Sequence, residues 1–216
     1  MDNTSAGMWK MNYNISGLHV LTDRVFAYPR QLFEVINLVL SGGASVIQLR
    51  DKTASFEEMF SLGKQLKELT ADQIPLIIND RIDVALALDA SGVHIGQKDI
   101  PAKEARKRIG HKMILGVSTS STEQAIKAQD DGADYLGVGP IFPTMSKMDT
   151  DPAIGLSGLK KIKESVKIPV IAIGGISMAN ASEVMDIADG IAVISAVLKA
   201  SDPEKAVRDL IQILKK

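Results

Sequence analysis

The feature that most constrains the fold of this 216-residue chain is a repeated alternation of short apolar runs and helix-like segments. Each run is followed by a few polar or Gly residues and then by a stretch with helical periodicity. Runs such as Val170–Ile173 and Ile191–Ile194 are continuously apolar, which is typical of strands buried on both faces of a parallel sheet. We therefore predict eight strands, over residues 17–22, 45–50, 75–79, 92–96, 114–118, 135–139, 169–174 and 190–195.

Helical patterns lie between these runs. From Phe56 to Leu69, and again from Pro203 to Leu214, apolar residues recur on one helical face. Ser121, Ser177 and Ser201 are predicted N-cap or pre-helix residues. Strict alternation of strand and helix predicts parallel strands joined by crossover helices. Eight such units can close a (β/α)₈ barrel, the TIM-barrel architecture, which is the fold that we predict.

No Pro- or Gly-rich stretch divides the chain, so we predict one barrel domain over residues 16–216, preceded by a loose polar lead over residues 1–15. Most connections must be short. The exception runs from Ile141 to Gly155, after the sixth predicted strand. Because long loops in compact domains are usually functional or disordered, we expect this one to close over bound substrates.

Composition excludes several classes of function. The net charge of −1 gives no basic excess, so we expect no nucleic-acid partner. The chain has no cysteine, which excludes disulfides, thiolate nucleophiles and Cys-based zinc sites and fits the cytoplasm. No apolar run approaches the roughly 20 residues of a membrane span, so we expect no membrane partner. The sequence leaves the oligomeric state open, with a homo-oligomer as one option.

The predicted strands end in residues suited to phosphate and metal binding. Active sites of such barrels form at the carboxyl ends of the strands. Arg50, Lys52 and Lys147 lie there and supply cations for phosphate oxygens. Asp80 and Asp99 lie there too, and two carboxylates beside a diphosphate make a reasonable Mg²⁺ site. The alternative for both aspartates is helix capping.

A second phosphate site is predicted where the seventh and eighth strands end. Gly174 and Gly175 follow the seventh strand, and Ser195 ends the eighth. Barrels often bind phosphate with these two loops, and glycine lets backbone N–H groups approach the anion closely. A plain tight turn is the alternative explanation of the two glycines.

Other polar residues are weaker candidates. His94, in the middle of its strand, is predicted to be a hydrogen-bonded imidazole of the barrel interior rather than a catalyst. Ser118 has no evident activating histidine, so we interpret it as a hydrogen-bond donor and not a nucleophile. We expect Tyr135 to be a packing residue, and the charged run Lys103–Lys112 to be a solvated helix face.

Taken together, the strand-end motifs resemble those of one known family. The stretches concerned are VIQLRDK at residues 46–52, NDR at 79–81, GVHIGQKD at 92–99, GVGPIFPT at 137–144, AIGGI at 172–176 and ISA at 194–196. In this order they resemble the thiamine phosphate synthase family, from about residue 18 to the C-terminus. Jointly the motifs are very specific, whereas NDR or GGI alone would be weak.

The resemblance implies a barrel enzyme that joins a hydroxymethylpyrimidine diphosphate to a thiazole phosphate, or to its carboxylated form, and releases pyrophosphate. It places Mg²⁺ on Asp80 and Asp99. The pyrimidine-diphosphate contacts it implies are Gln48, Arg50, Lys52, Asn79, Ser118 and Lys147. The thiazole-phosphate contacts it implies are Thr144, Ser146, Gly175, Ile194 and Ser195. We include the intervening Leu49, Asp51 and Met145 in the predicted binding segments, and predict four catalytic residues, Arg50, Lys52, Ser118 and Lys147.

Two departures from the family pattern are visible. The family commonly has Thr-x-Thr-Lys where this chain has Thr144-Met145-Ser146-Lys147, and serine keeps the hydroxyl group. In the first strand the family often has an aromatic residue, where this chain has His19. Three other functions stay open at this point: a thiazole tautomerase-like isomerase, a non-catalytic regulatory homologue and a sugar-phosphate isomerase on the same fold.

Overall fold

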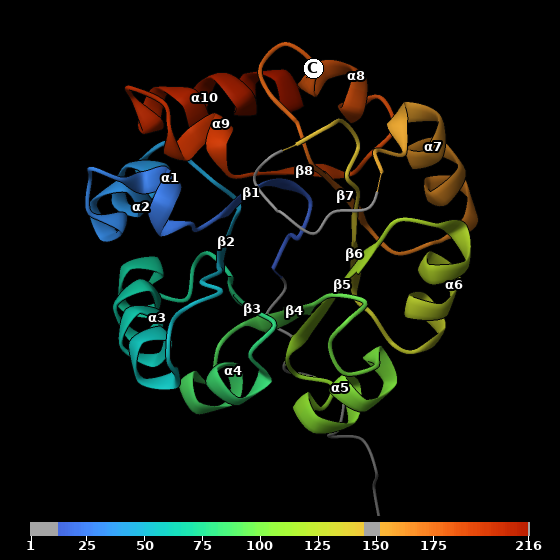
Figure 1. Cartoon of the computed structure of the whole chain (residues 1–216), viewed down its shortest axis with the longest axis horizontal. Coiled ribbons are helices and arrows are strands. Elements are labelled where there is room, and N and C mark those ends of the chain that lie inside the picture. The colour runs from blue at the N-terminus through green and yellow to red at the C-terminus, as the bar shows by residue number, and fades with distance from the viewer. Residues whose placement is uncertain (1–12, 145–151, 216) are drawn as a thin grey trace, which may run out of the picture.

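The strands of this chain close into a barrel. The computed structural model describes residues 13–144 and 152–215. Within them, eight parallel strands pair in sequence order and β8 pairs with β1, which confirms the predicted (β/α)₈ architecture (Figure 1). The strands are β1 (Gly17–Leu21), β2 (Val46–Leu49), β3 (Leu76–Asn79), β4 (Gly92–Ile95), β5 (Ile114–Thr119), β6 (Tyr135–Val138), β7 (Val170–Ile173) and β8 (Gly190–Val193).

Helices form a ring around the sheet, as Figure 1 shows. They are α1 (Arg24–Ala27), α2 (Leu32–Ser41), α3 (Phe56–Thr70), α4 (Ile82–Leu88), α5 (Ala102–Ile109), α6 (Thr122–Asp130), α7 (Gly155–Ser165), α8 (Ala181–Met185), α9 (Ser195–Leu198) and α10 (Pro203–Leu214). Ser121 caps α6 by accepting from the backbone N–H of Gln124. Ser177 and Ser201 precede their helices without being the N-cap residues, which are Asn180 and Asp202.

Each strand is buried on both faces, as its continuous apolar sequence predicts. Neighbouring residues of a strand point to opposite sides of the sheet. In β2, Gln48 lines the barrel interior, whereas Leu49 points outward and packs near Gly63 of α3. Burying one such leucine, isoleucine or valine stabilises the fold by about 1.5–3 kcal/mol. The apolar layer between sheet and helices therefore holds the ring of helices in place.

The amino ends of alternate strands are capped by four side chains, which we call the amino-end caps: Ser45, Ser91, Asp134 and Asp189. Each immediately precedes an even-numbered strand and accepts a hydrogen bond from a backbone N–H at the start of the preceding odd-numbered strand, at 2.7–3.3 Å. Unpaired backbone groups at a buried strand end are costly. The caps remove that cost at the end of the barrel opposite the predicted site.

Arg106 of α5 corrects the prediction that residues 103–112 form a solvated helix face. Its residue is only 9% exposed, and its guanidinium lies 2.6 Å from a carboxylate oxygen of Asp134. It also donates to the backbone carbonyls of Gly110, Met113 and Gly132. A planar guanidinium with five donors can satisfy several acceptors at once, so Arg106 ties α5 to the amino ends of two strands.

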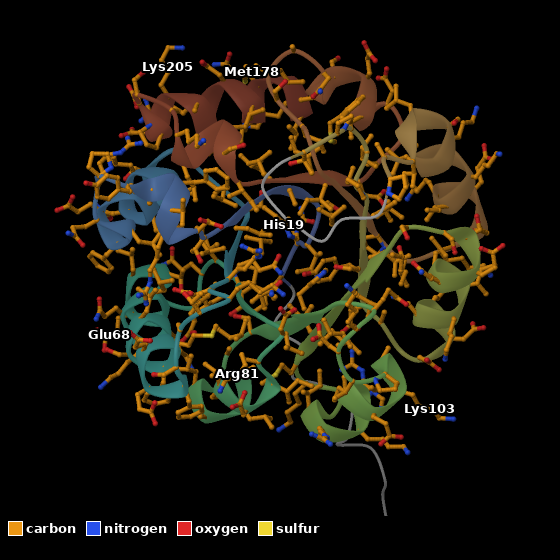
Figure 2. The ribbon with its side chains drawn as sticks, viewed as in Figure 1. His19, Glu68, Arg81, Lys103, Met178 and Lys205 are labelled. Atoms are coloured by element: carbon orange, nitrogen blue, oxygen red, sulfur yellow. The ribbon has the colours of Figure 1, made fainter. Side chains whose placement is uncertain are left out.

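The barrel interior begins at His19 of β1, which Figure 2 shows in the middle of the ring of helices. Its Nε2 lies 2.7 Å from the carbonyl oxygen of Ile15 and donates to it. Burial lowers the pKa of His19 to about 4, so the ring is neutral. Near the start of the described chain, Tyr13 donates from its hydroxyl group to the carbonyl of Asp72. None of the described helices combines the length and apolarity that crossing a bilayer requires.

Candidate active site

Lys52 and Asp80 lie together at the carboxyl ends of β2 and β3. The Nζ of Lys52 is 2.7 Å from a carboxylate oxygen of Asp80. The backbone of Asp80 has φ +63°, a left-handed conformation that aspartate adopts more readily than most residues. Its N–H donates to the carbonyl of His94 on β4, which continues the sheet pairing by one residue. The lysine side chain is 62% exposed, so this ion pair contributes little to stability.

Asp99, from the loop after β4, joins Asp80 at this rim. Burial raises the pKa of Asp99 first, and the negative charge of Asp80 raises it further. The backbone N–H of Gly96 donates to Asp99 at 2.7 Å and opposes the rise. The N-cap residues of α4 and α5 are Arg81 and Pro101, so neither aspartate is the cap of the helix that follows it. The structure thus brings the two predicted acids together.

This pair of carboxylates is the donor set that could hold a metal ion. In the described part of the chain, no group of three or more His, Asp or Glu side chains is arranged so that it could hold a metal ion. An all-protein metal centre therefore does not fit these residues. Magnesium commonly takes one or two carboxylates and completes its shell with phosphate oxygens and water. Two adjacent aspartates beside an exposed lysine fit a metal shared with a bound diphosphate.

Arg50 stands beside this group and is held by the first loop. Its guanidinium lies 3.0 Å from a carboxylate oxygen of Asp23, and both side chains are largely buried. The hydroxyl group of Thr22 donates to the carbonyl of Arg50 and accepts from its N–H. The Nε of Arg50 is buried without a hydrogen-bond partner among the described residues. This arrangement fixes the cation at the rim and leaves its buried Nε–H available to a ligand.

Leu49 and Asp51 were predicted as contacts in the same segment, but their side chains have other neighbours. Leu49 points away from the interior, so only its backbone could reach a ligand there. One oxygen of Asp51 accepts from the backbone of Thr53 and Ala54, and the other lies 2.7 Å from the Nε of Arg24. Asp51 therefore holds the shape of its own loop and joins it to α1.

A narrow cavity lies inside the barrel below the rim. Gln48 and Asn79, both predicted binding residues, meet beside it: the side-chain amide of Gln48 donates to the amide oxygen of Asn79 at 2.8 Å. The lining residues are His19, Leu21, Gln48, His94, Ser118, Tyr135, Gly137, Ile171, Ile173 and Ala192. Apolar walls with a few polar groups suit an aromatic ring that carries hydrogen-bonding atoms.

Ser118 corrects the sequence analysis, because a histidine does lie beside it. The Nε2 of His94 is 2.8 Å from the Oγ of Ser118, and the Nδ1 of His94 is 2.9 Å from the hydroxyl group of Tyr135. Tyr135 is therefore more than a packing residue. The signal available in the sequence is glycine: a Cβ at Gly116 or Gly137 would collide with the ring of His94, so these positions leave room for it.

The predicted monophosphate site corresponds to a second, open pocket of about 460 Å³ at the ends of β7 and β8. It is lined by Pro140, Thr144, Ile173, Gly174, Gly175, Ile176, Ala192, Val193, Ile194 and Ser195. Four of the predicted contacts, Thr144, Gly175, Ile194 and Ser195, are among them. The other predicted residues of this loop, Met145, Ser146 and Lys147, lie outside the described residues.

The two glycines of this pocket do more than form a turn. Gly174 and Gly175 have φ of +103° and +66°, which favour glycine. A Cβ on Gly175 would lie 2.7 Å from Phe142 and from Pro143 of the loop after β6. That loop is joined to β7 by a hydrogen bond from the N–H of Phe142 to the carbonyl of Gly174. Glycine is therefore required for the loop to approach the pocket this closely.

Comparisons with known proteins agree with this geometry. The family described as "Thiamine monophosphate synthase" matches residues 18–197. A protein of Pyrococcus furiosus titled thiamine phosphate pyrophosphorylase has a similar structure, with a TM-score of 0.84 and 46% identity over 92% of this chain and 95% of that one.

Curated relatives carry consistent names. A thiamine-phosphate synthase of Roseiflexus sp. (strain RS-1) is 53% identical over 195 residues, covering 89% of this chain and 83% of the relative. Another, of Desulfitobacterium hafniense (strain DSM 10664 / DCB-2), is 48% identical over 91% of this chain and 96% of its own length. The identities, the coverage and the family match together show that the chain belongs to the thiamine monophosphate synthase family.

Proposed function

We propose that this member of the thiamine-phosphate synthase family condenses 4-amino-2-methyl-5-(diphosphooxymethyl)pyrimidine with 4-methyl-5-(2-phosphooxyethyl)thiazole to give thiamine phosphate and pyrophosphate. With the carboxylated thiazole the products are the same, and the carboxyl group leaves as carbon dioxide. One observation carries the proposal. The rim holds an acid pair with a lysine at β2–β4 and an open glycine pocket at β7–β8, on different sides of an interior cavity. This arrangement suits two phosphorylated molecules that react between the two phosphate sites.

On the diphosphate side, the task of the protein is to neutralise the leaving group. Arg50, Lys52 and Lys147 supply positive charge to the departing oxygens in this proposal, and charge stabilisation of this kind is commonly a large catalytic contribution. Magnesium bound by Asp80 and Asp99 would supply further charge neutralisation to the diphosphate. Lys52 is exposed, and its ion pair within the described residues is with Asp80, so it can turn toward an arriving anion.

On the other side, the protein positions the nucleophile. The phosphate of the thiazole is proposed to bind in the pocket at Gly175, Ile194 and Ser195. The C–O bond to the diphosphate breaks with its electron pair leaving on pyrophosphate, and the electron-rich aminopyrimidine tolerates the positive charge on the exocyclic carbon. The lone pair of the thiazole nitrogen then forms the new C–N bond. Holding both molecules in place contributes much of the rate.

The partners proposed for the chain are therefore small phosphorylated molecules. A cytoplasmic location, a homo-oligomeric state, the absence of nucleic-acid and membrane partners and the division into a lead and a barrel at residue 16 stay predictions from the sequence. None of them alters the chemistry proposed for the rim.

The test is a pyrophosphate-release assay with each substrate alone, with both together, and with both after magnesium is removed by a chelator. We expect pyrophosphate and thiamine phosphate only when both substrates and magnesium are present. Pyrophosphate release without the thiazole phosphate would indicate a hydrolase. Isomerisation of a thiazole carboxylate without condensation would indicate the tautomerase, and tight binding of both substrates without turnover would indicate a regulatory homologue.

A further inference from the structure

A line of three polar side chains crosses from β6 through β4 to β5 inside the barrel. Tyr135 is 1% exposed and His94 is 6% exposed, and both line the interior cavity together with Ser118. The Tyr135 hydroxyl group contacts Nδ1 of His94 at 2.9 Å, and Nε2 of His94 contacts Oγ of Ser118 at 2.8 Å. Hydrogen bonds in such a line constrain one another, because each imidazole nitrogen of a neutral ring has one role.

The direction of the line follows from the buried phenol. Among the described residues, Nδ1 of His94 is the hydrogen-bonding partner of the Tyr135 hydroxyl group. If Nδ1 carried the ring proton, the phenol proton would be buried without an acceptor, which costs roughly 1–3 kcal/mol. Burial raises the pKa of Tyr135, so the phenol keeps its proton. Tyr135 therefore donates to Nδ1, and the neutral ring carries its proton on Nε2.

The same reasoning extends to Ser118. With its proton on Nε2, His94 donates to the Oγ of Ser118, and the hydroxyl proton of Ser118 cannot be directed back at the ring. Within the described residues, Oγ of Ser118 has no second protein partner, whereas its backbone carbonyl accepts from Gln97. The hydroxyl proton is thus directed toward whatever occupies the cavity that Ser118 lines.

Space for this line is provided by glycine. A Cβ on Gly116 would lie 2.4 Å from Nδ1 of His94 and from the hydroxyl oxygen of Tyr135. A Cβ on Gly137 would lie 2.8 Å from the same imidazole. Larger residues on these inward positions of β5 and β6 would displace both rings, so the geometry of the line depends on them.

We propose that Tyr135 and His94 are positioning residues that fix Ser118 as a hydrogen-bond donor to an acceptor atom of the pyrimidine diphosphate. The proposal rests on the proposed function. It also excludes Ser118 as a nucleophile activated by His94. In that case Nε2 would have to be unprotonated, so that it could take the proton of the hydroxyl group.

The first test measures the tautomer without any substrate. In protein labelled with ¹⁵N-histidine, the spectrum at neutral pH is expected to place the proton of His94 on Nε2, with the resonance assigned by its loss in His94→Gln. In Tyr135→Phe the Nδ1 tautomer should become populated. A wild-type proton on Nδ1 would overturn the proposal. Because this readout needs no turnover, it is independent of whether the condensation assay succeeds.

The second test is a double-mutant cycle on kcat of the condensation. Ser118→Ala is expected to lower kcat about 100-fold and Tyr135→Phe about 10-fold, since each weakens one aligned donor. The double variant should match Ser118→Ala within about twofold, because residues that act as a unit are not additive. A multiplicative loss of about 1,000-fold in the double variant would contradict action through Ser118. An unchanged kcat in Tyr135→Phe would do so too.

Variants of His94 distinguish two roles for its ring, a hydrogen-bond donor to Ser118 and a general base. Glutamine can offer an amide N–H near the position of Nε2, so His94→Gln should keep kcat within about fivefold, whereas His94→Leu should fall to the level of Ser118→Ala. If His94 were instead a general base, His94→Gln would lower kcat strongly, because glutamine cannot take up a proton. Thr119→Val is the matched control: its hydroxyl group is buried on the same strand without a partner among the described residues, and its loss should change neither kcat nor stability.

Discussion

At the amino end of the barrel, Asp134 and Asp189 accept from backbone N–H groups and pair with Arg106 and Lys163 at 2.6 and 2.5 Å. At the carboxyl end, Asp80 and Asp99 instead lie near each other, so that the charge of one raises the pKa of the other. Both ends carry aspartates in the connections next to the strands. Only at the amino end does the fold supply each carboxylate with its own cation and its own strand N–H.

The difference teaches how one fold separates stability from function. A carboxylate that is paired both with its own cation and with a strand N–H stabilises the native chain and offers nothing to a ligand. Two carboxylates that repel each other lower the stability of the empty site, and a bound cation removes that repulsion. The predictions below test whether the two ends differ in this way.

The largest effect is expected at the carboxyl end. Lys147→Ala should lower kcat by roughly 10²–10³-fold with an unchanged melting temperature, because a cation that stabilises the leaving pyrophosphate is lost. Steady-state pyrophosphate release measures it. The control is Lys161→Ala on the exposed face of α7, which should have no effect. Equal rates in both variants would remove Lys147 from the site.

The next largest effect is expected at the amino end. Asp134→Ala should lower the free energy of unfolding by about 3 kcal/mol, since Arg106 keeps a buried charge without its partner and a strand N–H loses its acceptor. Urea unfolding measures the change. Glu104→Ala, which breaks the exposed pair with Lys107, should leave stability almost unchanged. If Asp134→Ala folds but shows a large fall in kcat, the amino end also serves catalysis, and the proposed division between stability and function is wrong.

Removing one acid of the proposed metal pair should have a smaller but distinctive effect. Asp99→Ala should raise the magnesium concentration for half-maximal rate about tenfold to thirtyfold, equivalent to roughly 1.4–2 kcal/mol of binding. A magnesium titration of the rate measures this. Asp83→Ala, on α4 and paired with Arg81, is the control that should keep the wild-type requirement. Identical titrations for both would argue against a metal at Asp99.

His19, in the barrel interior between the two ends, predicts that the free energy of unfolding depends on pH. The pKa of His19 is about 4 in the folded chain against 6.5 for an unperturbed histidine, so the unfolded chain binds the extra proton first as pH falls. Stability is therefore lost between about pH 6.5 and 4, by up to about 1.4 kcal/mol per pH unit. Urea unfolding at pH 7 and 5 should differ by roughly 2 kcal/mol more in the wild type than in His19→Gln.

The smallest effect compares two glycines with nearly the same φ. Gly175 at the carboxyl end has φ +66° and Gly110 at the amino end has φ +67°, but only at Gly175 would a Cβ meet neighbouring atoms within 4 Å. Alanine at either position meets the strain of a positive φ. Gly175→Ala should in addition raise KM for the thiazole phosphate about fivefold, or about 1 kcal/mol, which Gly110→Ala should not.

Much of the fold could be predicted from local pattern. All eight predicted strands formed, and α10 has the predicted bounds Pro203–Leu214. Apolar runs and helical periodicity are properties of short segments, so they can be read one at a time. Helix caps were less certain: α10 begins after Asp202 rather than Ser201, because Pro203 occupies the first helical turn and Asp202 accepts from Lys205.

The candidate site, like the fold, could be predicted from the sequence only in part. Parallel strands place all their carboxyl ends at one rim, so the sequence by itself determined that Lys52, Asp80 and Gly175 belong to the same face of the molecule. Which of them touch was decided by barrel closure and register. His94 was predicted to face the barrel interior, but its contact with Ser118 on the neighbouring strand was missed, because the sequence of one strand does not give its register against the next. Pairing of side chains depends on the tertiary structure for this reason, whereas membership of the rim does not.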